Sequence, residues 1–297
     1  MSEANNNDWI QIKIRSDSRN AETIADLLEQ FGALAVTYSD AEDDPILEPL
    51  PGEHRLWPNT DITGLFDQGY DPLPTIGKLK ELLGDHVPVA AVRLQDKNWI
   101  RAWMDQFKPL KFGRRLWICP SWMQVQEKDS VVVMLDPGLA FGTGTHPTTA
   151  LCLTWLDSLD LKDQRVLDYG CGSGILGIAA LKLGALEVTG IDIDEQALLA
   201  SRENASRNDV GNRLKLLLGG KKLNFTPATV TVANILAGPL AQLEPEIAAL
   251  TCSGGLLALS GILDEQADEV LAAYRKDFDI RKERSLNGWA LLTGTKK

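Results

Sequence analysis

A short stretch between two apolar runs, Asp168 to Gly174, has the composition of a ligand-binding turn. It reads Asp-Tyr-Gly-Cys-Gly-Ser-Gly, with a strand-like run before it and a helix-like run after it. Glycines at such a turn let the backbone bend sharply and approach a ligand closely. The dinucleotide fingerprint GxGxxG would need its third glycine where Ile175 stands, so this spacing favours a compact adenosine ligand over a pyrophosphate. We therefore expect Gly170 and Gly172 to contact a nucleoside cofactor.

Two further polar residues stand where later strands of the same series are expected to end. Asp192 follows the run "EVTGI", and Asn234 lies within "VTVANIL". The carboxyl ends of parallel strands meet at one edge of a sheet, and ligands bind outside that edge. A carboxylate there can accept both hydroxyls of a ribose, and an amide offers both a donor and an acceptor. We expect Asp192 and Asn234 to face the ligand, and Asp194 to cap the helix that follows.

The segment "LDPGLAFGTGTHPTT", residues 135 to 149, is unusually rich in glycine and threonine. Pro147 stands near the first position of the next helix, with Thr149 in its first turn. Free N–H groups and hydroxyls at a helix N-terminus favour a carboxylate, such as that of an amino-acid ligand. The glycines around Phe141 would let the segment close as a lid, with Phe141 covering the cofactor. The alternative is a disordered connector.

The elements that must position these residues form a regular series from residue 165 onward. Six strand-like apolar runs appear there: "RVLDYG", "EVTGIDI", "LKLLLGG", "VTVANIL", "GLLALSGI" and "WALLTGT". Helical runs lie between several of them, which is the pattern of a buried parallel sheet. The last run follows "RKERSLNG" through a short connection rather than a helical crossover. We therefore expect this last strand to be antiparallel.

The first 96 residues show a different pattern and carry none of these motifs. They contain a strand, helix, strand series, then an acidic proline-rich loop, then a second such series. Two such units predict a ferredoxin-like α+β domain. Trp99, Trp103 and Phe107 follow at helical spacing and are expected to pack one domain against the other; a peptide-binding stripe is the alternative.

These patterns divide the chain into three parts. We expect a ferredoxin-like domain over residues 1–96, a helical linker over 97–108 and an α/β catalytic domain over 109–297.

Composition limits the class of protein. The chain of 297 residues is 44% hydrophobic and 24% charged, as in soluble globular proteins, and has no apolar run of the length that spans a membrane. The first residues lack the layout of a signal peptide, so we expect a cytoplasmic protein. The net charge of −11 argues against nonspecific nucleic-acid binding and is compatible with a basic protein partner. The four cysteines are scattered and there are three histidines, so no metal site is expected.

The motifs also carry a resemblance to known enzymes. "DYGCGSG" and "GIDID" resemble the class I S-adenosylmethionine-dependent methyltransferases. "LDPGLAFGTGTHPTT" together with "VANILAGPL" is more specific and is similar to the PrmA family, which methylates the eleventh protein of the large ribosomal subunit. The resemblance covers nearly the whole chain. It implies a small substrate-recognition domain, a helical linker, and a Rossmann-like domain with a mostly parallel seven-stranded sheet whose last strand is antiparallel.

The same resemblance implies roles for individual residues. The family pattern places Thr149, Gly170, Asp192 and Asn234 on S-adenosylmethionine, with Phe141 in the lid. It also implies trimethylation of lysine side chains and of the N-terminal amine of that ribosomal protein. We expect no direct contact with DNA or a membrane, and a monomer.

The residues after Asn234 indicate which acceptor is methylated. Amide and nucleobase methyltransferases often carry Asn/Asp-Pro-Pro-aromatic at this place, whereas Ile235, Leu236 and Ala237 stand here. No aromatic ring follows to stack on a planar amide or base, which favours an aliphatic amine. We expect in-line attack by a neutral amine oriented by Asn234. Among the histidines only His146 lies near the site, so desolvation of the amine is expected to replace a dedicated base.

Three alternatives remain at this point. The same fold could act on ribosomal RNA or on a small molecule, because a fold does not fix a substrate. The chain could be a nonenzymatic ribosome-assembly module that senses the cofactor. A nicotinamide-dependent dehydrogenase is disfavoured by the glycine spacing. The acidic charge and the N-terminal domain count against ribosomal RNA.

Overall fold

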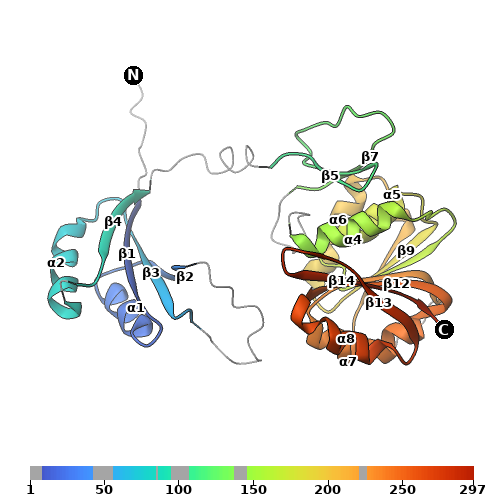
Figure 1. The fold of residues 1–297 in the computed structure, drawn as a ribbon. Helices are drawn as coiled ribbons and strands as arrows, with labels where there is room; N and C mark the ends of the chain where they lie inside the picture. The colour runs from blue at the N-terminus through green and yellow to red at the C-terminus, as the bar shows by residue number, and fades with distance from the viewer. Residues whose placement is uncertain (1–8, 43–55, 85, 95–106, 137–145, 221–225) are drawn as a thin grey trace, which may run out of the picture. The chain divides into compact units, whose positions relative to one another are not determined.

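The computed structural model describes residues 9–42, 56–84, 86–94, 107–136, 146–220 and 226–297. The chain divides into two compact units, Met1–Gln106 and Phe107–Lys297 (Figure 1). Each unit has a hydrophobic core of its own.

The N-terminal unit is a four-stranded antiparallel sheet with two helices. Its elements are β1 (Trp9–Asp17), α1 (Ala21–Gln30), β2 (Ala35–Asp40), β3 (Asn59–Phe66), α2 (Pro72–Leu83) and β4 (Val89–Leu94). The strand order is β2-β3-β1-β4, so both β1 and β3 lie inside the sheet. This is the ferredoxin-like arrangement that the repeated strand, helix, strand series predicted.

Alternation along β1 explains how this small sheet is held together. Ile12 and Ile14 are fully buried against Ile24 and Leu28 of α1 and their neighbours. On the opposite face of the sheet, the largely buried carboxylate of Asp61 is bound by side chains of β1 that alternate with the isoleucines. One strand therefore supplies both an apolar and a charged face.

The C-terminal unit contains a small sheet and a large sheet. The small sheet is formed by β5 (Leu110–Phe112), β6 (Leu116–Cys119) and β7 (Val131–Met134). The large sheet contains β8 (Arg165–Tyr169), β9 (Glu187–Asp192), β10 (Leu214–Leu218), β11 (Ala228–Asn234), β12 (Thr251–Leu263), β13 (Phe278–Leu286) and β14 (Trp289–Lys296). The main helices are α4 (Pro147–Ser158), α5 (Ile175–Lys182), α6 (Glu195–Arg207), α7 (Ala237–Leu250) and α8 (Ala267–Tyr274).

The order of strands in the large sheet is β10-β9-β8-β11-β12-β14-β13. The pairs from β10 to β12 are parallel, and β14 is antiparallel to both of its neighbours. The predicted Rossmann-like sheet with an antiparallel last strand is therefore confirmed. Six of its strands had appeared as apolar runs; β13 had not, because it is an edge strand whose only buried residues are Phe278 and Ile280.

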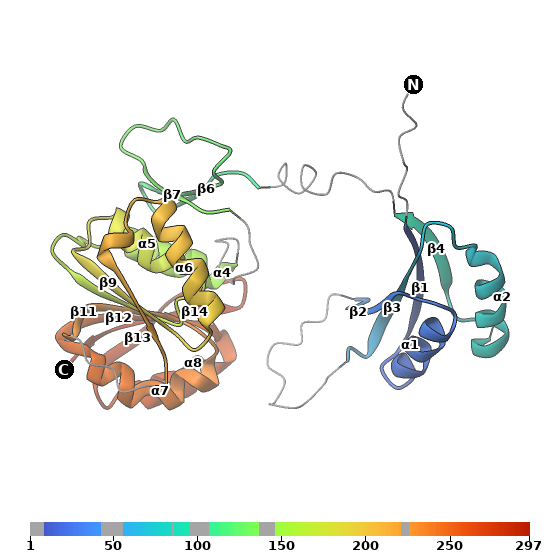
Figure 2. The same cartoon turned by 180° about the vertical axis from the view of Figure 1, so that it is seen from behind.

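The chain reverses direction across this sheet between β8 and β11. From β8 it proceeds outward through β9 and β10, then returns to β11 and proceeds the other way. Helices α4, α5 and α6 cover one face, and α7 and α8 cover the other (Figures 1 and 2). In such sheets the carboxyl ends of the strands beside the reversal form the ligand crevice. Within the described part of the chain, no helix has the length and hydropathy needed to span a membrane.

Candidate functional site

The glycine turn after β8 has a backbone that only glycine accommodates. Gly170, Gly172 and Gly174 have φ angles of 75°, 53° and 78°. A Cβ atom on Gly170 would lie 2.2 Å from Cγ2 of Ile235, the residue that follows β11. The N–H groups of Gly170 and Cys171 both donate to the carbonyl of Ile191, at 2.8 and 2.9 Å. The turn is thereby fixed against β9 on one side and β11 on the other.

Asp192 is held in place at the end of β9 by two backbone donors. Its Oδ2 accepts the Gly172 N–H at 2.8 Å, and its Oδ1 accepts the Asp194 N–H at 3.0 Å. Each carboxylate oxygen retains acceptor capacity, so the group is oriented without being saturated. Asp194 accepts the Gln196 N–H at 2.8 Å and is the N-cap of α6, which confirms its predicted role. We call Asp192 and residues 170–174 the glycine side of the site.

A second carboxylate lies beneath the same turn. Asp168 is 1% exposed, and its Oδ2 accepts the Gly177 N–H at 2.8 Å, which ties β8 to α5. Burial raises the pKa of Asp168 to about 7, and the negative charge of Asp192 adds to this effect. Asp168 therefore carries a proton for part of the time near neutral pH.

On the other side of the reversal, the structure brings Asn234 and Thr149 together. The amide Nδ2 of Asn234 donates to Oγ1 of Thr149 at 3.3 Å. Thr149 is fully buried, so in this structure its hydroxyl supports the amide rather than facing solvent. Phe141 lies outside the described residues. We call Asn234 and the first turn of α4 the asparagine side of the site.

The first turn of α4 is capped by a histidine. The helix begins at Pro147, as the sequence predicted, and His146 is its N-cap. Nδ1 of His146 accepts the Thr148 N–H at 3.4 Å and lies 2.7 Å from the Thr148 hydroxyl. Because a backbone N–H can only donate, this contact implies that the neutral ring carries its proton on Nε2. Burial also lowers the pKa of His146, so the ring is neutral at pH 7.

A β-bulge brings β12 against the residue after Asn234. The pairing of β12 with β14 shifts between Leu259 and Ile262, where Gly261 has a φ of 84°. A Cβ atom on Gly261 would lie 2.2 Å from the carbonyl oxygen of Ile235. Ile235 is therefore held between Gly170, in the turn after β8, and Gly261 of β12. Bulges of this kind are frequent beside functional sites.

Sequence reasoning missed two apolar features of this edge. Ile193, directly after Asp192, is 85% exposed although it is a large aliphatic residue. The ring of Trp289, at the start of β14, lies 4.9 Å from the His146 ring in an edge-to-face arrangement with an interplanar angle of 70°. The alternation in "GIDID" was the available signal for Ile193, whereas no local pattern pairs positions 146 and 289.

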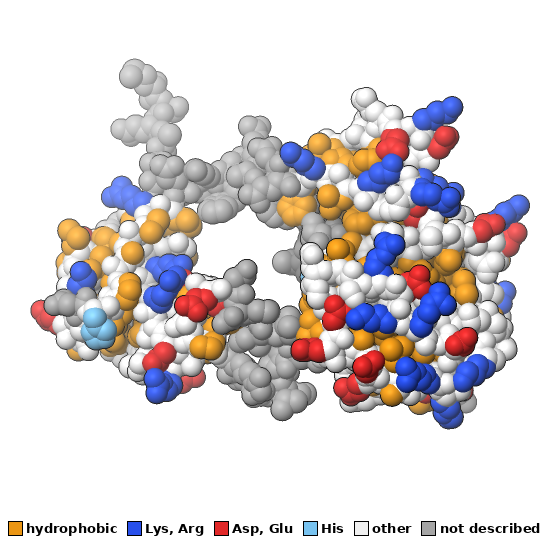
Figure 3. All heavy atoms as spheres, in the orientation of Figure 1, with side chains coloured by type: hydrophobic (Ala, Val, Ile, Leu, Met, Phe, Trp, Pro, Cys, Tyr) orange, Lys and Arg blue, Asp and Glu red, His pale blue; other side chains and the backbone are white. Residues whose placement is uncertain are grey.

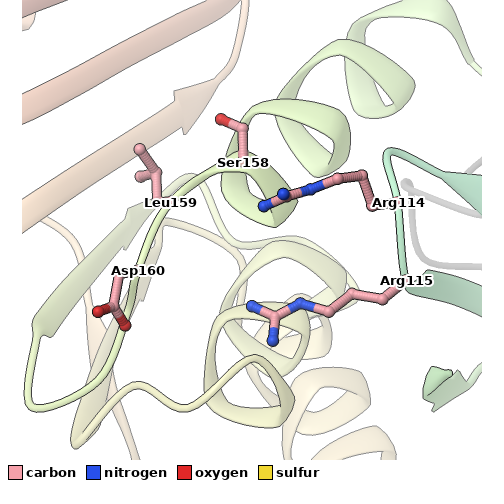
Figure 4. A pocket seen from close by; sticks show the side chains of 5 residues that line it. All are labelled: Arg114, Arg115, Ser158, Leu159 and Asp160. Carbon is pink, nitrogen blue, oxygen red and sulfur yellow. The ribbon is translucent and has the colours of Figure 1, made fainter. Parts of the chain in front are cut away.

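A hollow of the described surface lies elsewhere. It measures about 540 Å³ and is lined by Arg114, Arg115, Ser158, Leu159 and Asp160 (Figure 4). Leu159 follows the C-terminal end of α4, whereas Thr149 stands in the first turn of that helix. Arg115 is already paired with the buried carboxylate of Asp157, at 3.5 Å. The hollow therefore belongs to the amino edge of the sheet and is separate from the site.

Comparison with known proteins gives a consistent result. The family model described as "Ribosomal protein L11 methyltransferase (PrmA)" matches residues 8–297. Ribosomal protein L11 methyltransferases of Shewanella sp. (strain ANA-3) and Haemophilus influenzae (strain PittEE) are each 54% identical over 291 residues, which cover 97% of this chain and 99% of theirs. The crystal structure of ribosomal protein L11 methylase from Lactobacillus delbrueckii subsp. bulgaricus has 33% identity and a TM-score of 0.59, covering 64% of this chain and 100% of that one.

Proposed function

The chain belongs to the ribosomal protein L11 methyltransferase family, and we propose that it transfers methyl groups from S-adenosylmethionine to amino groups of ribosomal protein L11. The observation that carries this proposal is the shared sheet edge. The glycine side, with the oriented Asp192, lies directly beside Asn234 and its hydrogen bond to Thr149. A nucleoside site and an amide that can orient an amine are thus neighbours across the strand reversal.

The residues of the glycine side fit the adenosine part of this cofactor. A Cβ atom at Gly170 would collide with Ile235, so the glycine lets the turn pack closely beside Asn234, and the proposed cofactor would lie along its backbone. Asp192 would accept the ribose hydroxyls, and the exposed aliphatic chain of Ile193 would pack against the adenine ring. Gly172 would contribute by holding Asp192, to which its N–H donates. The first turn of α4 would favour the methionine carboxylate.

The chain's own residues would position the amine and keep it neutral. When bound, S-adenosylmethionine supplies a methyl group that forms a bond to the amine nitrogen through its lone pair, while the electron pair of the breaking carbon–sulfur bond stays on sulfur. Asn234 would orient that nitrogen by accepting an N–H through its amide oxygen, because its Nδ2 already donates to Thr149. The product methylammonium then loses a proton to solvent.

No histidine is needed as a strong base in this scheme. Nδ1 of His146 is engaged with Thr148, and the other ring nitrogen carries the proton in the neutral ring. Exclusion of water from the closed site would lower the pKa of the amine. We therefore propose that desolvation supplies the neutral nucleophile.

The finer parts of the function are also proposals. We propose that the ferredoxin-like domain recognises the ribosomal protein, because the cofactor motifs all lie in the C-terminal unit. We further propose that lysine side chains and the N-terminal amine are trimethylated. A protein that modifies a ribosomal component would work in the cytoplasm.

The proposal can be tested by intact-mass measurement. Purified ribosomal protein L11 is incubated with the full chain and S-adenosylmethionine, and mass increases in steps of one methyl group are expected. Ribosomal RNA and the other ribosomal proteins in the same mixture test the alternative substrates. A folded chain that binds cofactor but transfers no methyl group to any component would instead support the nonenzymatic assembly module.

A further inference from the structure

A series of contacts runs from Asn234 through neighbouring elements and returns to Asn234. Asn234 is the β11 register partner of Ser260 on β12, and the Ser260 hydroxyl donates to the carbonyl of Ala290 at 2.9 Å. Trp289 precedes Ala290 and contacts His146, which lies one helical turn from Thr149. We call this set of residues the amine ring. Its members are Asn234, Thr149, His146, Trp289, Ala290 and Ser260.

Trp289 lies at the same edge of the sheet as Asn234 because β14 runs antiparallel to its neighbours. In a parallel strand, the first residue would lie at the opposite edge of the sheet from Asn234. In β14, the first residue, Trp289, pairs with Leu263 at the end of β12 and therefore lies at the carboxyl edge. The residue is half-buried, whereas the next three residues of β14 are buried in the core. A large aromatic side chain is thus kept partly open at the edge where the ligand crevice lies.

The indole is also held on a rigid support. Asn287 and Gly288, with φ angles of 50° and 79°, form the tight turn between β13 and β14. The Gly288 carbonyl accepts the Asp264 N–H at 2.9 Å, which fixes the turn to the end of β12. The His146 ring also contacts the indole edge-to-face, with the ring centroids 4.9 Å apart. Trp289 is therefore oriented before any ligand binds.

The nearby carboxylate of Asp264 is already paired and His146 is uncharged. The aromatic ring of Trp289 is therefore the group best suited to bind a cation. Asp264, which follows the strand partner of Trp289, is bound by Nζ of Lys282 at 2.7 Å and by the Ser285 hydroxyl at 2.6 Å. Its charge is thereby neutralised. His146 contacts the indole as an uncharged ring. A methylated ammonium group, which has few N–H donors left, is recognised in proteins by aromatic faces.

We infer that Trp289 is the specificity-determining residue of the amine ring, and that its indole makes a cation–π contact with the nitrogen once methyl transfer has made that nitrogen positively charged. The inference rests on the proposed methyl transfer to an amine. During that transfer positive charge moves from sulfur to nitrogen, so an aromatic ring beside the nitrogen stabilises the charge as it develops. Asn234 orients the amine while it still has N–H groups. As methyl groups replace these hydrogens, Trp289 contacts the same nitrogen through its aromatic face.

The experiment uses two ligands that cannot be methylated. One is Nα-acetyl-Nε-trimethyllysine amide, and the other is its neutral isostere with carbon in place of the charged nitrogen. Binding to the full chain is measured by calorimetry in the presence of saturating S-adenosylhomocysteine. The wild type should bind the cation roughly tenfold more tightly than the isostere, the range expected for a desolvated cation–π contact.

Three variants distinguish recognition from structural support. Trp289→Leu should bring the affinity ratio of the two ligands close to 1, and Trp289→Phe, which keeps a ring, should give an intermediate ratio. Trp117→Leu is the matched control, because it removes an indole that faces Lys111 on the small sheet, at 5.6 Å. It should leave the ratio unchanged. If Trp289→Leu does not fold, the comparison of Trp289→Phe with the wild type carries the test.

Two results would overturn the inference. One is a wild type that binds neither ligand, or both equally well; the other is a Trp289 variant that keeps the wild-type ratio. Methylation of ribosomal protein L11 by the wild type is measured separately by intact mass. A failure of the proposed function would appear in that measurement, whereas a failure of this inference would leave it unchanged.

Discussion

The two sides of the site differ in the kind of group that forms them: backbone on the glycine side and side chains on the asparagine side. On the glycine side, the proposed ligand surface is a backbone turn, and the one side chain proposed to contact ribose, Asp192, is held by two backbone N–H groups. On the asparagine side, the contacts join side chains of three segments: Asn234 at the end of β11, the first turn of α4 with His146 and Thr149, and Trp289 of β14. Backbone geometry changes little with substitution, whereas side-chain contacts can be exchanged one by one. If the proposed function holds, the same edge would bind one constant cofactor through backbone and an acceptor through side chains that substitution can change.

The largest effect is expected from deletion of the N-terminal unit. It should abolish recognition of the protein substrate while leaving cofactor binding intact. Removal of residues 1–106 should leave the affinity for S-adenosylmethionine within about twofold, because both sides of the site lie in the unit Phe107–Lys297. Methylation of ribosomal protein L11 should fall by roughly 10³-fold or more, since the interface that orders the substrate would be lost. Calorimetry and intact mass measure the two quantities. Retained methylation would show that the asparagine side recognises the protein by itself.

A substitution at Asn234 should affect transfer more than cofactor binding. Asn234→Ala should lower kcat by roughly 10²-fold, because a misplaced nucleophile loses most of the advantage of orientation. The fold should survive, since Asn234 is half-buried at the open edge of the sheet. Single-turnover transfer at saturating cofactor is the measurement, with Asn234→Asp as a variant that keeps the oxygen. If only cofactor affinity changes, Asn234 belongs functionally to the glycine side.

The reciprocal substitution at Asp192 should weaken binding. Asp192→Ala removes a charge-assisted contact and should raise the Kd for S-adenosylmethionine about 10- to 100-fold, corresponding to roughly 1–3 kcal/mol. Transfer at saturation should change less than in Asn234→Ala. Calorimetry on the folded variant is the direct test, and an unchanged Kd would falsify the ribose assignment. Asp194→Ala is the matched control, because that side chain caps α6.

The smallest effect concerns the stability of the glycine side. The folded-state pKa of Asp168 is raised to about 7, so near pH 6 the folded protein holds a proton that the unfolded chain has released. Stability therefore falls as pH rises toward 7 and levels off above it. Between pH 6 and pH 8 the wild type should lose about 1 kcal/mol relative to Asp168→Asn. Denaturant unfolding without cofactor measures this, and parallel pH profiles would show that Asp168 is ionised throughout.

The difference between the two sides also explains what the sequence could predict. The glycine side consists of contiguous motifs with a known backbone mechanism, so the turn, Asp192 and the cap at Asp194 could be identified from local spacing. The central parallel strands β8, β9 and β11 were predicted from apolar runs because most of their residues are buried. β13 could not be found in this way, since an edge strand exposes most of its residues.

The asparagine side depends on contacts between distant parts of the chain. Asn234 and the first turn of α4 could be singled out, but their hydrogen bond follows from the packing of α4 on the sheet. The pairing of His146 with Trp289 requires both the direction of β14 and the position of α4. No periodicity or motif encodes such a contact, because the two residues are far apart in the sequence and belong to different elements. Phe141 stays a prediction.

The position of β14 has a consequence for the order in which the protein can mature. Among the strands of the large sheet β14 is the last in the chain, yet it lies between β12 and β13 rather than at an edge. While the ribosome is still synthesising this segment, β13 has no partner strand, and Trp289 is absent from the amine ring. The enzyme should therefore remain inactive as a nascent chain until residues 289–296 have emerged from the exit tunnel.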